Sequence, residues 1–383
     1  MCHALDAPTA NAILSPLTPR SFSSLRLPLL KWYDRSRRPL PWRAAPGVLP
    51  DPYAVMVSEF MLQQTQVTTV IPYFLRFMEK FPSVSDLAAA DEHDVLRLWQ
   101  GLGYYSRARN LRAAARCVVE KHSGKIPAEI DALLDLPGIG RYTAGAIASL
   151  AFDKRAAILD GNVARVLCRL NAIQSDPRNP RTNKKLWQIA AEIVPAKRPG
   201  DFNSALMELG ATICTPRQPQ CHDCPLRRRC AAHAAGSQDQ IPPRKKSRPT
   251  PLERRWVFAI RNGNRWLIEQ RPARGRWASL WQFITIPAPN GAQKVTIKIA
   301  SRALGTTVHD LLSLAEINHT LTHRRYEFAV FSCRTNDPAV SESTASIASR
   351  RWVTLNELSH FPLPKPHVTI ANLLRAGLQS PSA

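Results

Sequence analysis

Residues 136–144 read LPGIGRYTA and connect two apolar segments, 130–136 and 143–151, that we expect to be helices. Gly138 and Gly140 permit a tight hairpin there, because glycine adopts backbone angles that other residues avoid. The hairpin would expose amide N–H groups at the start of the second helix, where they can bind an anion such as a DNA phosphate. Such a contact follows the DNA backbone and not its base sequence. The alternative is an ordinary turn, since a G-x-G sequence alone is common.

Four cysteines lie close together downstream of the hairpin. Cys214, Cys221, Cys224 and Cys230 have the spacing C-x6-C-x2-C-x5-C. In a chain without a recognisable secretion signal, thiols so close together indicate a metal or iron–sulfur site rather than disulfides. A four-cysteine zinc site and a [4Fe–4S] cluster both fit these ligands, although a single C-x2-C pair is less typical of structural zinc. Either centre would fix the shape of a loop that is rich in arginine (Arg217, Arg227, Arg228 and Arg229).

The chain is strongly basic. It has 383 residues, with 52 Lys and Arg against 29 Asp and Glu, which gives a formal charge of +23. Such an excess of positive charge indicates a polyanionic partner, and nucleic acid is the first candidate. The alternative is a generally basic protein without such a partner. The length suggests two or three domains, each large enough to bury its own core.

No stretch of 18 apolar residues occurs, so we expect no membrane span. Residues 1–27 lack the charged segment and apolar core of a secretory signal, and we expect a short disordered tail there. An organelle transit peptide is the alternative, because this segment contains Ser and Arg and few acidic residues. We expect a cytoplasmic protein, associated with the nucleoid of a bacterium.

Residues 28–232 have the pattern of a helical domain. Amphipathic runs alternate with Pro and Gly at 84–101, 108–121, 185–194 and 202–213. A further helix should begin at Asp51 and Pro52, because the carboxylate can cap a helix whose first position is proline.

The pattern changes after residue 232. Residues 233–252 are predicted to be a basic linker, since most of the segment is polar and rich in proline (GSQDQIPPRKKSRPTP at 236–251). Residues 253–376 contain short alternating segments that we predict to be strands, at 255–260, 265–270, 324–331 and 351–354. Residues 377–383 would form a tail. The sequence therefore predicts an all-α domain followed by a smaller α+β domain.

The hairpin and the cysteine loop, together with ILDGNV at 158–163, resemble the helix–hairpin–helix DNA glycosylases. Two earlier stretches, VSEFMLQQTQ at 57–66 and GLGYYSR at 101–107, are similar to those of the MutY-type adenine DNA glycosylases within that family. The resemblance is dense over 28–232 and loose over 255–375. It implies a mainly α helix–hairpin–helix glycosylase domain, a [4Fe–4S] cluster on the four cysteines, and DNA as the partner.

Removal of a base from DNA breaks an N-glycosidic bond through an oxocarbenium-like state, which calls for one neutral carboxylic acid and one carboxylate. Glu59 shares a helical stripe with Val55 and Leu62, where desolvation would raise its pKa and suit it to protonate the leaving base. Asp160 precedes a helix expected from about Val163, whose positive end would favour the ionised carboxylate. The alternatives are a solvated Glu59 and an Asp160 that only caps the helix.

The resemblance places both carboxylates and several neighbours in the active site. Glu59 and Asp160 match the family's acid and aspartate positions, and Asn162 matches a companion that orients these groups. The family's adenine pocket is matched by Trp42, Arg43, Leu62 and Glu208. Residues 44–50 form a longer segment than the family pattern has before Asp51, so the lip of the pocket is expected to differ.

A base leaves the DNA stack only if side chains fill the gap behind it. Gln64 and Tyr104 match the intercalating residues of the family, and Arg107, in the same motif as Tyr104, is expected to bind DNA as well. An ordinary Gln on a helix surface and an ordinary core Tyr are the alternatives.

Tyr142 decides whether the enzyme also cuts the DNA strand. Relatives such as endonuclease III carry lysine at this place, and its amine attacks the sugar to form a Schiff base. Tyrosine cannot form that imine, so the resemblance implies a monofunctional glycosylase.

The C-terminal domain resembles a Nudix domain in the segment RWASLWQF at 276–283. Nudix hydrolases bind Mg²⁺ through a run of glutamates, yet the comparable segment 294–304 contains no acidic residue, so we expect binding without hydrolysis. MutY-type enzymes recognise 8-oxoguanine through a Phe-Ser-His loop. The matching residues here are Leu321, Thr322 and His323, which keep a hydroxyl group and the histidine but lose the aromatic ring.

Together these features predict an adenine DNA glycosylase of base excision repair. It would be a monomer that acts on adenine opposite 8-oxoguanine or guanine in double-stranded DNA. A pyrimidine-lesion glycosylase of the endonuclease III type is the first rival, which Tyr142 and the C-terminal domain disfavour. A non-catalytic, cluster-bearing DNA-binding protein is the second, which the pair Glu59 and Asp160 disfavours.

Overall fold

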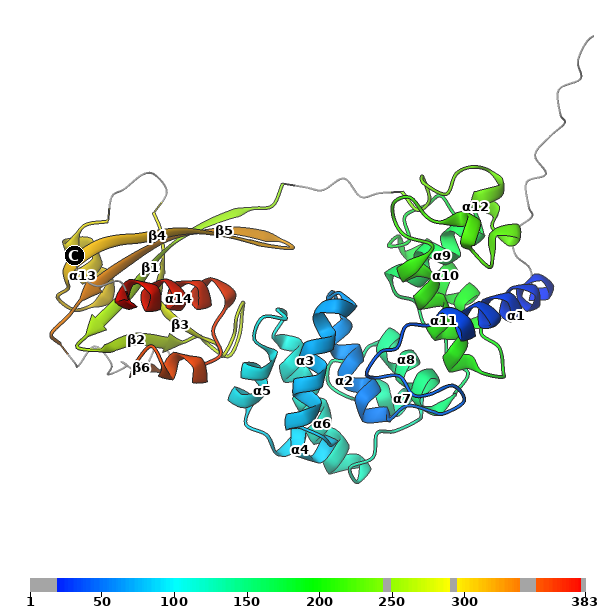
Figure 1. The fold of residues 1–383 in the computed structure, drawn as a ribbon, viewed down its shortest axis with the longest axis horizontal. Helices are drawn as coiled ribbons and strands as arrows, with labels where there is room; N and C mark the ends of the chain where they lie inside the picture. The colour runs from blue at the N-terminus through cyan, green and yellow to red at the C-terminus, as the bar shows by residue number, and fades with distance from the viewer. Residues whose placement is uncertain (1–18, 244–248, 290–294, 338–348, 380–383) are drawn as a thin grey trace, which may run out of the picture. The chain divides into compact units, whose positions relative to one another are not determined.

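The computed structural model describes residues 19–243, 249–289, 295–337 and 349–379 (Figure 1). These residues fall into two compact units. The first combines the residues up to Ala89 with Ala113–Lys246, and the second combines Ala90–Arg112 with the residues from Ser247 onward. The first unit is helical, and most of the second is a β-sheet with its helices. Within the described ranges, no helix is long and apolar enough to cross a membrane.

Helices dominate the chain before the linker, as predicted. They are α1 (Pro19–Ser36), α2 (Pro52–Leu62), α3 (Val67–Lys80), α4 (Val84–Ala89), α5 (Glu92–Trp99), α6 (Ser106–His122), α7 (Ile130–Leu134), α8 (Arg141–Phe152), α9 (Gly161–Leu170), α10 (Pro180–Ile193), α11 (Pro199–Thr212) and α12 (Ala231–Ala234). The run predicted at 84–101 is two helices, because the Asp91 side chain accepts a hydrogen bond from the His93 amide and caps α5.

α1 corrects the prediction for the N-terminus. Phe22, Leu25, Leu29 and Tyr33 recur every three or four positions and are all buried in the core of the first unit. The chain is therefore helical from Pro19, where we expected a disordered tail up to residue 27. Pro28 interrupts the pattern as a helix breaker, which is why the stripe is easy to overlook. Residues 1–18 lie outside the described residues.

α2 is buried along almost its whole length and forms the wall of the cavity described below. Asp51 caps the helix by accepting hydrogen bonds from the amides of Tyr53 and Ala54, and Pro52 occupies its first position, as predicted. Glu59 is the only charged residue in this helix, whose sequence is otherwise almost entirely apolar. α2 thus places a single carboxyl group, that of Glu59, in an apolar interior.

α8 follows the predicted hairpin. Gly138 has φ +77°, in the left-handed region that favours glycine, while Gly140 is extended and directly precedes the helix. Gly145, one turn into α8, permits a close approach to the segment before α9. A Cβ atom on Gly145 would lie 2.2 Å from the Ala157 carbonyl oxygen. The same helix packs on α2 and brings Tyr142 to Glu59.

The second unit contains a six-stranded mixed sheet with the order β4-β5-β1-β3-β2-β6. Among the strands of the described residues, only the β1–β5 pair is parallel. The strands are β1 (Leu252–Asn262), β2 (Arg265–Gln270), β3 (Trp281–Pro287), β4 (His309–Leu321), β5 (Arg324–Arg334) and β6 (Arg350–Val353).

Both faces of this sheet are buried. Val257 and Ala259 of β1 belong to a cluster that includes α14 (Lys365–Gln379), whereas Phe258 belongs to a cluster that includes α13 (Ile297–Leu304). The sheet therefore lies between two helices, and the predicted α+β class is confirmed. The predicted strands correspond to β1, β2, β5 and β6. We missed β4 and also β3, which has buried residues on both faces over most of its length and so lacks an alternating pattern.

The predicted linker is partly packed. Ile241 is 1% exposed within the core cluster of the first unit, and its carbonyl oxygen accepts a hydrogen bond from Arg169 Nε at 2.8 Å. Residues 244–248 lie outside the described residues. At the C-terminal end α14 continues to Gln379, so residues 377–379 are helical where we expected a tail, and 380–383 lie outside the described residues.

Candidate active site

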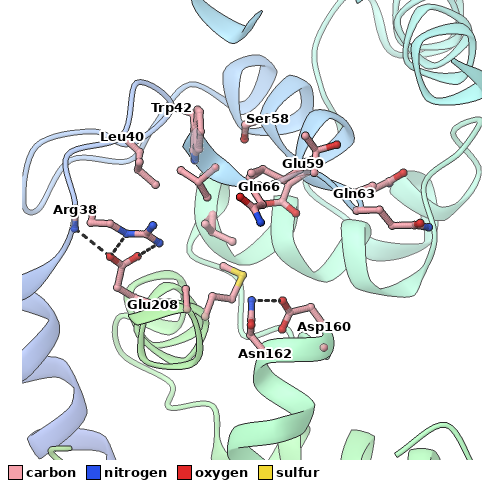
Figure 2. A pocket seen from close by; sticks show the side chains of 18 of the residues that line it. Arg38, Leu40, Trp42, Ser58, Glu59, Gln63, Gln66, Asp160, Asn162 and Glu208 are labelled. Carbon is pink, nitrogen blue, oxygen red and sulfur yellow. Dashed lines mark hydrogen bonds and ion pairs between the residues drawn. The ribbon is translucent and has the colours of Figure 1, made fainter. Parts of the chain in front are cut away.

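A cavity of about 1010 Å³ opens among α2, α8, α11 and the N-terminus of α9 (Figure 2). Segments far apart in the sequence line it. The predicted site residues among them are Trp42, Arg43, Glu59, Leu62, Gln64, Tyr142, Asp160, Asn162 and Glu208. Residues chosen from separate motifs thus meet at one place. Arg38, Arg165 and Met207 also line the cavity and were not predicted.

Glu59 has the environment of a neutral acid. The residue is 5% exposed, and its Oε2 atom has no hydrogen-bond partner. Burial raises the pKa of this carboxyl to about 7, the hydrogen bond with Tyr142 lowers it, and the charge of Asp160 raises it further. The alternative of a solvated Glu59 is therefore wrong. At neutral pH about half of the molecules would keep the proton on Glu59.

Tyr142 is the second residue of α8 and faces Glu59. Its hydroxyl group donates a hydrogen bond to the Met207 Sδ atom at 3.3 Å and also shares a hydrogen bond with Glu59. Burial, followed by the charges of Glu59 and Asp160, raises the pKa of Tyr142 well above its usual value. Tyr142 is therefore a neutral phenol with a single proton to donate.

Asp160 caps α9 and lines the cavity at the same time. Its Oδ1 atom accepts a hydrogen bond from the Val163 amide at 2.7 Å, and its Oδ2 atom accepts one from Asn162 Nδ2 at 3.1 Å (Figure 2). Burial raises the pKa of Asp160, and these hydrogen bonds and the charge of Arg165 oppose the rise. We expected the helix terminus to dominate, but desolvation outweighs it.

Arg165 joins the carboxylate side of the cavity to the cysteine loop. Its Nη2 atom donates to Asn162 Oδ1 at 2.9 Å and to the Gly210 carbonyl at 2.7 Å, and its Nε atom donates to the Cys214 carbonyl at 2.7 Å. The spacing of Arg165 from Asn162, three residues along one helix, was the available sequence signal. Asn162 is thereby held from both sides, by Asp160 and by Arg165.

Glu208 is 1% exposed and accepts four hydrogen bonds on the opposite wall. Figure 2 shows its pairing with Arg38. Arg38 donates from its backbone amide and Nε to Oε1 at 3.2 and 2.6 Å and from Nη2 to Oε2 at 3.1 Å, and Arg43 Nη2 donates to Oε2 at 2.9 Å. Burial would raise the pKa of Glu208, but the two arginines outweigh it and lower the pKa. The cavity therefore holds a protonatable acid on one side and an ionised carboxylate on the other.

Gln64 and Tyr104 both have left-handed backbones, with φ of +60° and +48°. Gln64 lies beyond the end of α2, and Tyr104 is 41% exposed, so neither the helix-surface Gln nor the core Tyr is correct. Unfavourable backbone angles of this kind are found preferentially at functional positions. Within the second unit, the Tyr104 hydroxyl lies 2.5 Å from the Thr322 Oγ1 atom.

Arg107 corrects a prediction. It is 6% exposed, and its Nη2 atom donates to the carbonyl oxygens of Leu102 and Gly103 at 3.2 and 3.1 Å. Its guanidinium also lies over the rings of Trp99 and Tyr104. Burial lowers the pKa of Arg107 to about 10. The side chain therefore supports the turn that presents Tyr104, where we expected a direct DNA contact.

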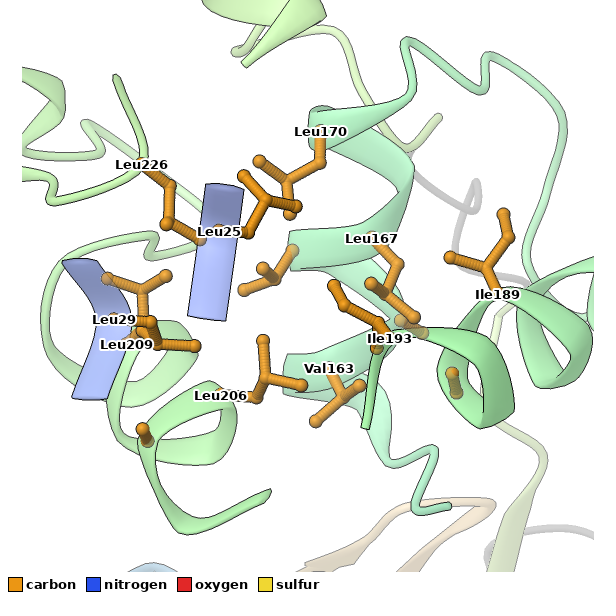
Figure 3. Packing of buried hydrophobic residues seen from close by; sticks show 14 of the residues in the cluster. Leu25, Leu29, Val163, Leu167, Leu170, Ile189, Ile193, Leu206, Leu209 and Leu226 are labelled. Atoms are coloured by element: carbon orange, nitrogen blue, oxygen red, sulfur yellow. The ribbon is translucent and has the colours of Figure 1, made fainter. Parts of the chain in front are cut away.

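The four predicted cysteines follow α11 in a loop anchored to the first unit. Leu226, between Cys224 and Cys230, packs in the core cluster with Leu25 and Leu170 (Figure 3). Burial raises the pKa of the Cys224 thiol to about 12, and the charges of the other three cysteines contribute to the rise. Arg227, Arg228 and Arg229 are exposed.

The donor set of this loop fits a metal–sulfur centre. All four candidate ligands are sulfur, and the buried Arg169 donates from Nη1 to Cys214 Sγ at 3.3 Å, which suits a negatively charged thiolate. In the part of the chain that the structure describes, no three Cys, His, Asp or Glu side chains are already gathered as a metal-binding group.

The tip of the β4–β5 hairpin carries the predicted recognition loop. Leu321 pairs with Arg324, so Thr322 and His323 form a two-residue turn and are exposed. Leu321 packs against the core on the α14 side, where the family's loop has an aromatic ring. α13, the comparable Nudix helix, reads IKIASRAL and offers no carboxylate for Mg²⁺.

The matches to protein families agree with this architecture. Residues 57–192 match the HhH-GPD superfamily of base excision DNA repair proteins, and residues 256–373 match the NUDIX domain. A solved structure of a thermostable thymine-DNA glycosylase superposes with a TM-score of 0.50 at 30% identity, covering 56% of this chain and 98% of that one. The fold and the cavity thus define a helix–hairpin–helix DNA glycosylase joined to a Nudix domain. Both matched segments lie within the predicted domains 28–232 and 253–376.

Three curated relatives are all called adenine DNA glycosylase. The chain is 38% identical to the rat (Rattus norvegicus) protein, over 88% of this chain and 75% of that one. It is 38% identical to the human protein over 88% and 71%, and 33% identical to the protein of Buchnera aphidicola subsp. Acyrthosiphon pisum over 91% and 96%. The chain belongs to the MutY-type adenine DNA glycosylases, and the predicted activity, excision of adenine in base excision repair, is confirmed.

Proposed function

We propose that the enzyme removes adenine paired with 8-oxoguanine or guanine, with Glu59 as the general acid and Asp160 as the stabiliser of the sugar cation. The observation that carries this proposal is the Glu59 side chain, which is buried beside Tyr142, has a pKa near 7 and leaves its Oε2 atom without a partner inside the cavity. Such a carboxyl group can hold a proton at neutral pH and deliver it to a bound base.

The chemistry uses each carboxylate differently. Glu59 gives its proton to a ring nitrogen of adenine as the bond between C1′ and the base breaks, and the electron pair of that bond leaves with the base. Asp160 lies near the positive charge that develops on the sugar, and Asn162 holds its Oδ2 atom in place. Water then adds to C1′ and completes the hydrolysis. Tyr142 has no amine, so no imine forms and the strand is left uncut.

The wall opposite Glu59 suits a purine. Glu208 with Arg38 and Arg43 provides a fixed polar edge, while Trp42 and Leu62 provide apolar surface for the ring. An adenine in the cavity would find acceptor and donor groups that hydrogen bonds to one another already hold in place. Gln64 and Tyr104 would fill the gap in the DNA stack.

The four cysteines would hold a [4Fe–4S] cluster that orders the loop carrying Arg227, Arg228 and Arg229 for contact with DNA phosphates. The support is the all-sulfur donor set and the Arg169 hydrogen bond to Cys214. Purified protein should then contain close to four irons and four acid-labile sulfides per chain, with broad visible absorption that Cys224→Ser diminishes. Zinc in place of iron would contradict this part of the proposal.

Recognition of the opposite base would fall to Thr322 and His323 at the exposed hairpin tip. We also propose that the protein acts as a monomer in the cytoplasm and that its substrate is double-stranded DNA. The charge of +23 supports DNA binding, because it attracts the phosphates.

The decisive test is single-turnover cleavage of a duplex with adenine opposite 8-oxoguanine, with and without alkali. The wild-type protein should release adenine and leave a strand that breaks only after alkali treatment. Glu59→Gln and Asp160→Asn should both lose at least two orders of magnitude in rate and keep duplex binding, because phosphate contacts supply most of the affinity. Strand breakage without alkali, or cleavage of oxidised pyrimidines in place of adenine, would favour an endonuclease III-type activity.

A further inference from the structure

The Tyr142 hydroxyl group has two acceptors for one proton. Met207 Sδ lies 3.3 Å from the phenol oxygen in hydrogen-bonding geometry, and the same hydroxyl shares a hydrogen bond with Glu59. All three side chains line the same cavity. A neutral phenol donates one hydrogen bond and can accept others, so it serves only one of these acceptors at a time.

The direction of the Tyr142–Glu59 hydrogen bond therefore depends on the state of the acid. When Glu59 is protonated, its O–H group can donate to the phenol oxygen while the phenol donates to Met207. When Glu59 is ionised, only the phenol can donate, and its O–H group must turn from the sulfur to the carboxylate. The change is a rotation about the C–O bond of Tyr142, and no covalent bond is formed or broken.

We infer that Met207 is a positioning residue. Its thioether sulfur accepts a hydrogen bond from the Tyr142 hydroxyl group while Glu59 is protonated. The sulfur loses this hydrogen bond once Glu59 has transferred its proton to the base. This inference rests on the proposed acid role of Glu59.

The strengths of the two acceptors suit this exchange. A thioether is a weak hydrogen-bond acceptor and a carboxylate is a strong one. The sulfur can therefore accept the Tyr142 hydrogen bond while Glu59 is neutral, but the carboxylate accepts it once Glu59 is ionised. The phenol thus stabilises the carboxylate only as it forms. A group that stabilises only the charge that develops in the transition state lowers the activation barrier without stabilising the ground state. An aliphatic side chain at 207 would leave the phenol donating to Glu59 throughout.

The other charged groups around Glu59 are the same in the wild type and in the Met207 variants. Asp160 at the start of α9 raises the pKa of Glu59. The charged residues of α3 and α8, the helices that pack on α2, are exposed (Arg76, Glu79, Lys80 and Arg141). On α11, Glu208 is neutralised by its two arginines. Met207 is therefore the neighbour whose exchange alters the Tyr142 hydrogen bond without altering a charge.

The test is the pH dependence of single-turnover adenine release by the full-length enzyme. In the wild type the rate should fall as pH rises through the pKa of Glu59. Met207→Leu should move this limb to lower pH by about 0.5–1 unit, since the phenol then favours the ionised acid. Met207→Gln, whose amide oxygen is a stronger acceptor, should move the limb to higher pH. Met56→Leu is the matched control, a fully buried methionine of α2 outside the cavity, and should leave the limb in place.

Tyr142→Phe separates the hydrogen bond from packing. This variant should move the limb to higher pH by itself, and Met207→Leu should then add no further shift. A limb that stays in place in Met207→Leu, or that shifts equally in the Tyr142→Phe background, overturns the role of Met207 while leaving the acid role of Glu59 intact. Glu59→Gln distinguishes the two failures, because full activity in that variant would remove the acid itself.

Discussion

Burial of Glu59 has a cost in stability that depends on pH. Its pKa is about 7 in the folded protein, against about 4.5 for an exposed carboxyl. Between these values the unfolded chain loses its proton first, so the free energy of unfolding falls as pH rises through this range and is unaffected below it. The full cost above pH 7 is on the order of 3 kcal/mol. Glu59→Gln should remove this dependence.

The measurement is urea unfolding of both proteins at pH 4.5, 6 and 8. The stability of Glu59→Gln relative to the wild type should increase steadily over this series. The same relative stability at all three values would mean that the folded pKa of Glu59 is close to that of an exposed carboxyl.

Tyr142→Lys should give an enzyme that forms a covalent imine with the sugar of its DNA substrate. The side chain lies in the cavity beside Glu59, where burial would lower the pKa of a lysine and leave a free amine for attack on C1′. Borohydride should then reduce the imine to a stable protein–DNA adduct, which the wild type does not form. Absence of an adduct, in a variant that still binds the duplex, would show that position 142 does not face the sugar.

Motifs predicted the proposed catalytic residues, but not the residues that form hydrogen bonds with them. Glu59 and Asp160 were found because each stands in a recognisable stretch, and Glu208 because it matches a position of the family's adenine pocket. Arg38 was not, because its partner Glu208 is 170 residues away and nothing local marks the pair. Met207 was not singled out for the same reason, since its neighbour Tyr142 is 65 residues distant. Long-range pairs of this kind depend on packing that a local pattern does not contain.

At the level of the elements, α8 depends on one glycine. A Cβ atom at Gly145 would lie 2.2 Å from the Ala157 carbonyl oxygen, so Gly145→Ala must push α8 away from the segment that leads to Asp160. We expect a loss of at least ~2 kcal/mol in stability, together with slower base release as Tyr142 and Asp160 separate.

Gly161→Ala is the matched control for stability. Gly161 begins α9, and a Cβ atom there meets nothing within 4 Å, so this exchange should change stability by less than ~1 kcal/mol. Thermal unfolding of the two variants beside the wild type gives the comparison. Equal stability of both variants would mean that α8 tolerates a side chain at this crossing.

The local sequence pattern predicted some elements with their bounds and missed others. β2 was predicted with its observed bounds, because its apolar run at 266–268 is short and is followed directly by the polar residues Glu269 and Gln270. β3 was missed since its first four residues are all buried, and α1 was missed because Pro28 interrupts an otherwise regular stripe. The hairpin at Gly138 was predicted because glycine there meets a specific backbone need, a φ of +77°.

At the scale of the whole molecule, the proposed excision site and the proposed recognition loop lie in separate compact units. The cavity with Glu59 and Asp160 belongs to the first unit, whereas the hairpin tip with Thr322 belongs to the second. Excision and recognition of the opposite base should therefore be separable, because removal of the hairpin tip leaves every residue that lines the cavity.

A chain ending at residue 251 should retain adenine release opposite guanine and lose its preference for adenine opposite 8-oxoguanine. In the full-length protein, Thr322→Ala and His323→Ala should each reproduce part of that loss, about 5–10-fold on the 8-oxoguanine pair, because each removes a polar contact worth about 1 kcal/mol. Thr322→Ser keeps the hydroxyl and should behave like the wild type. Single-turnover rates on the two mispairs, measured in parallel, give the ratio that matters. If the shortened chain keeps the full-length ratio, recognition of 8-oxoguanine resides with the helices, and the β4–β5 hairpin has another role.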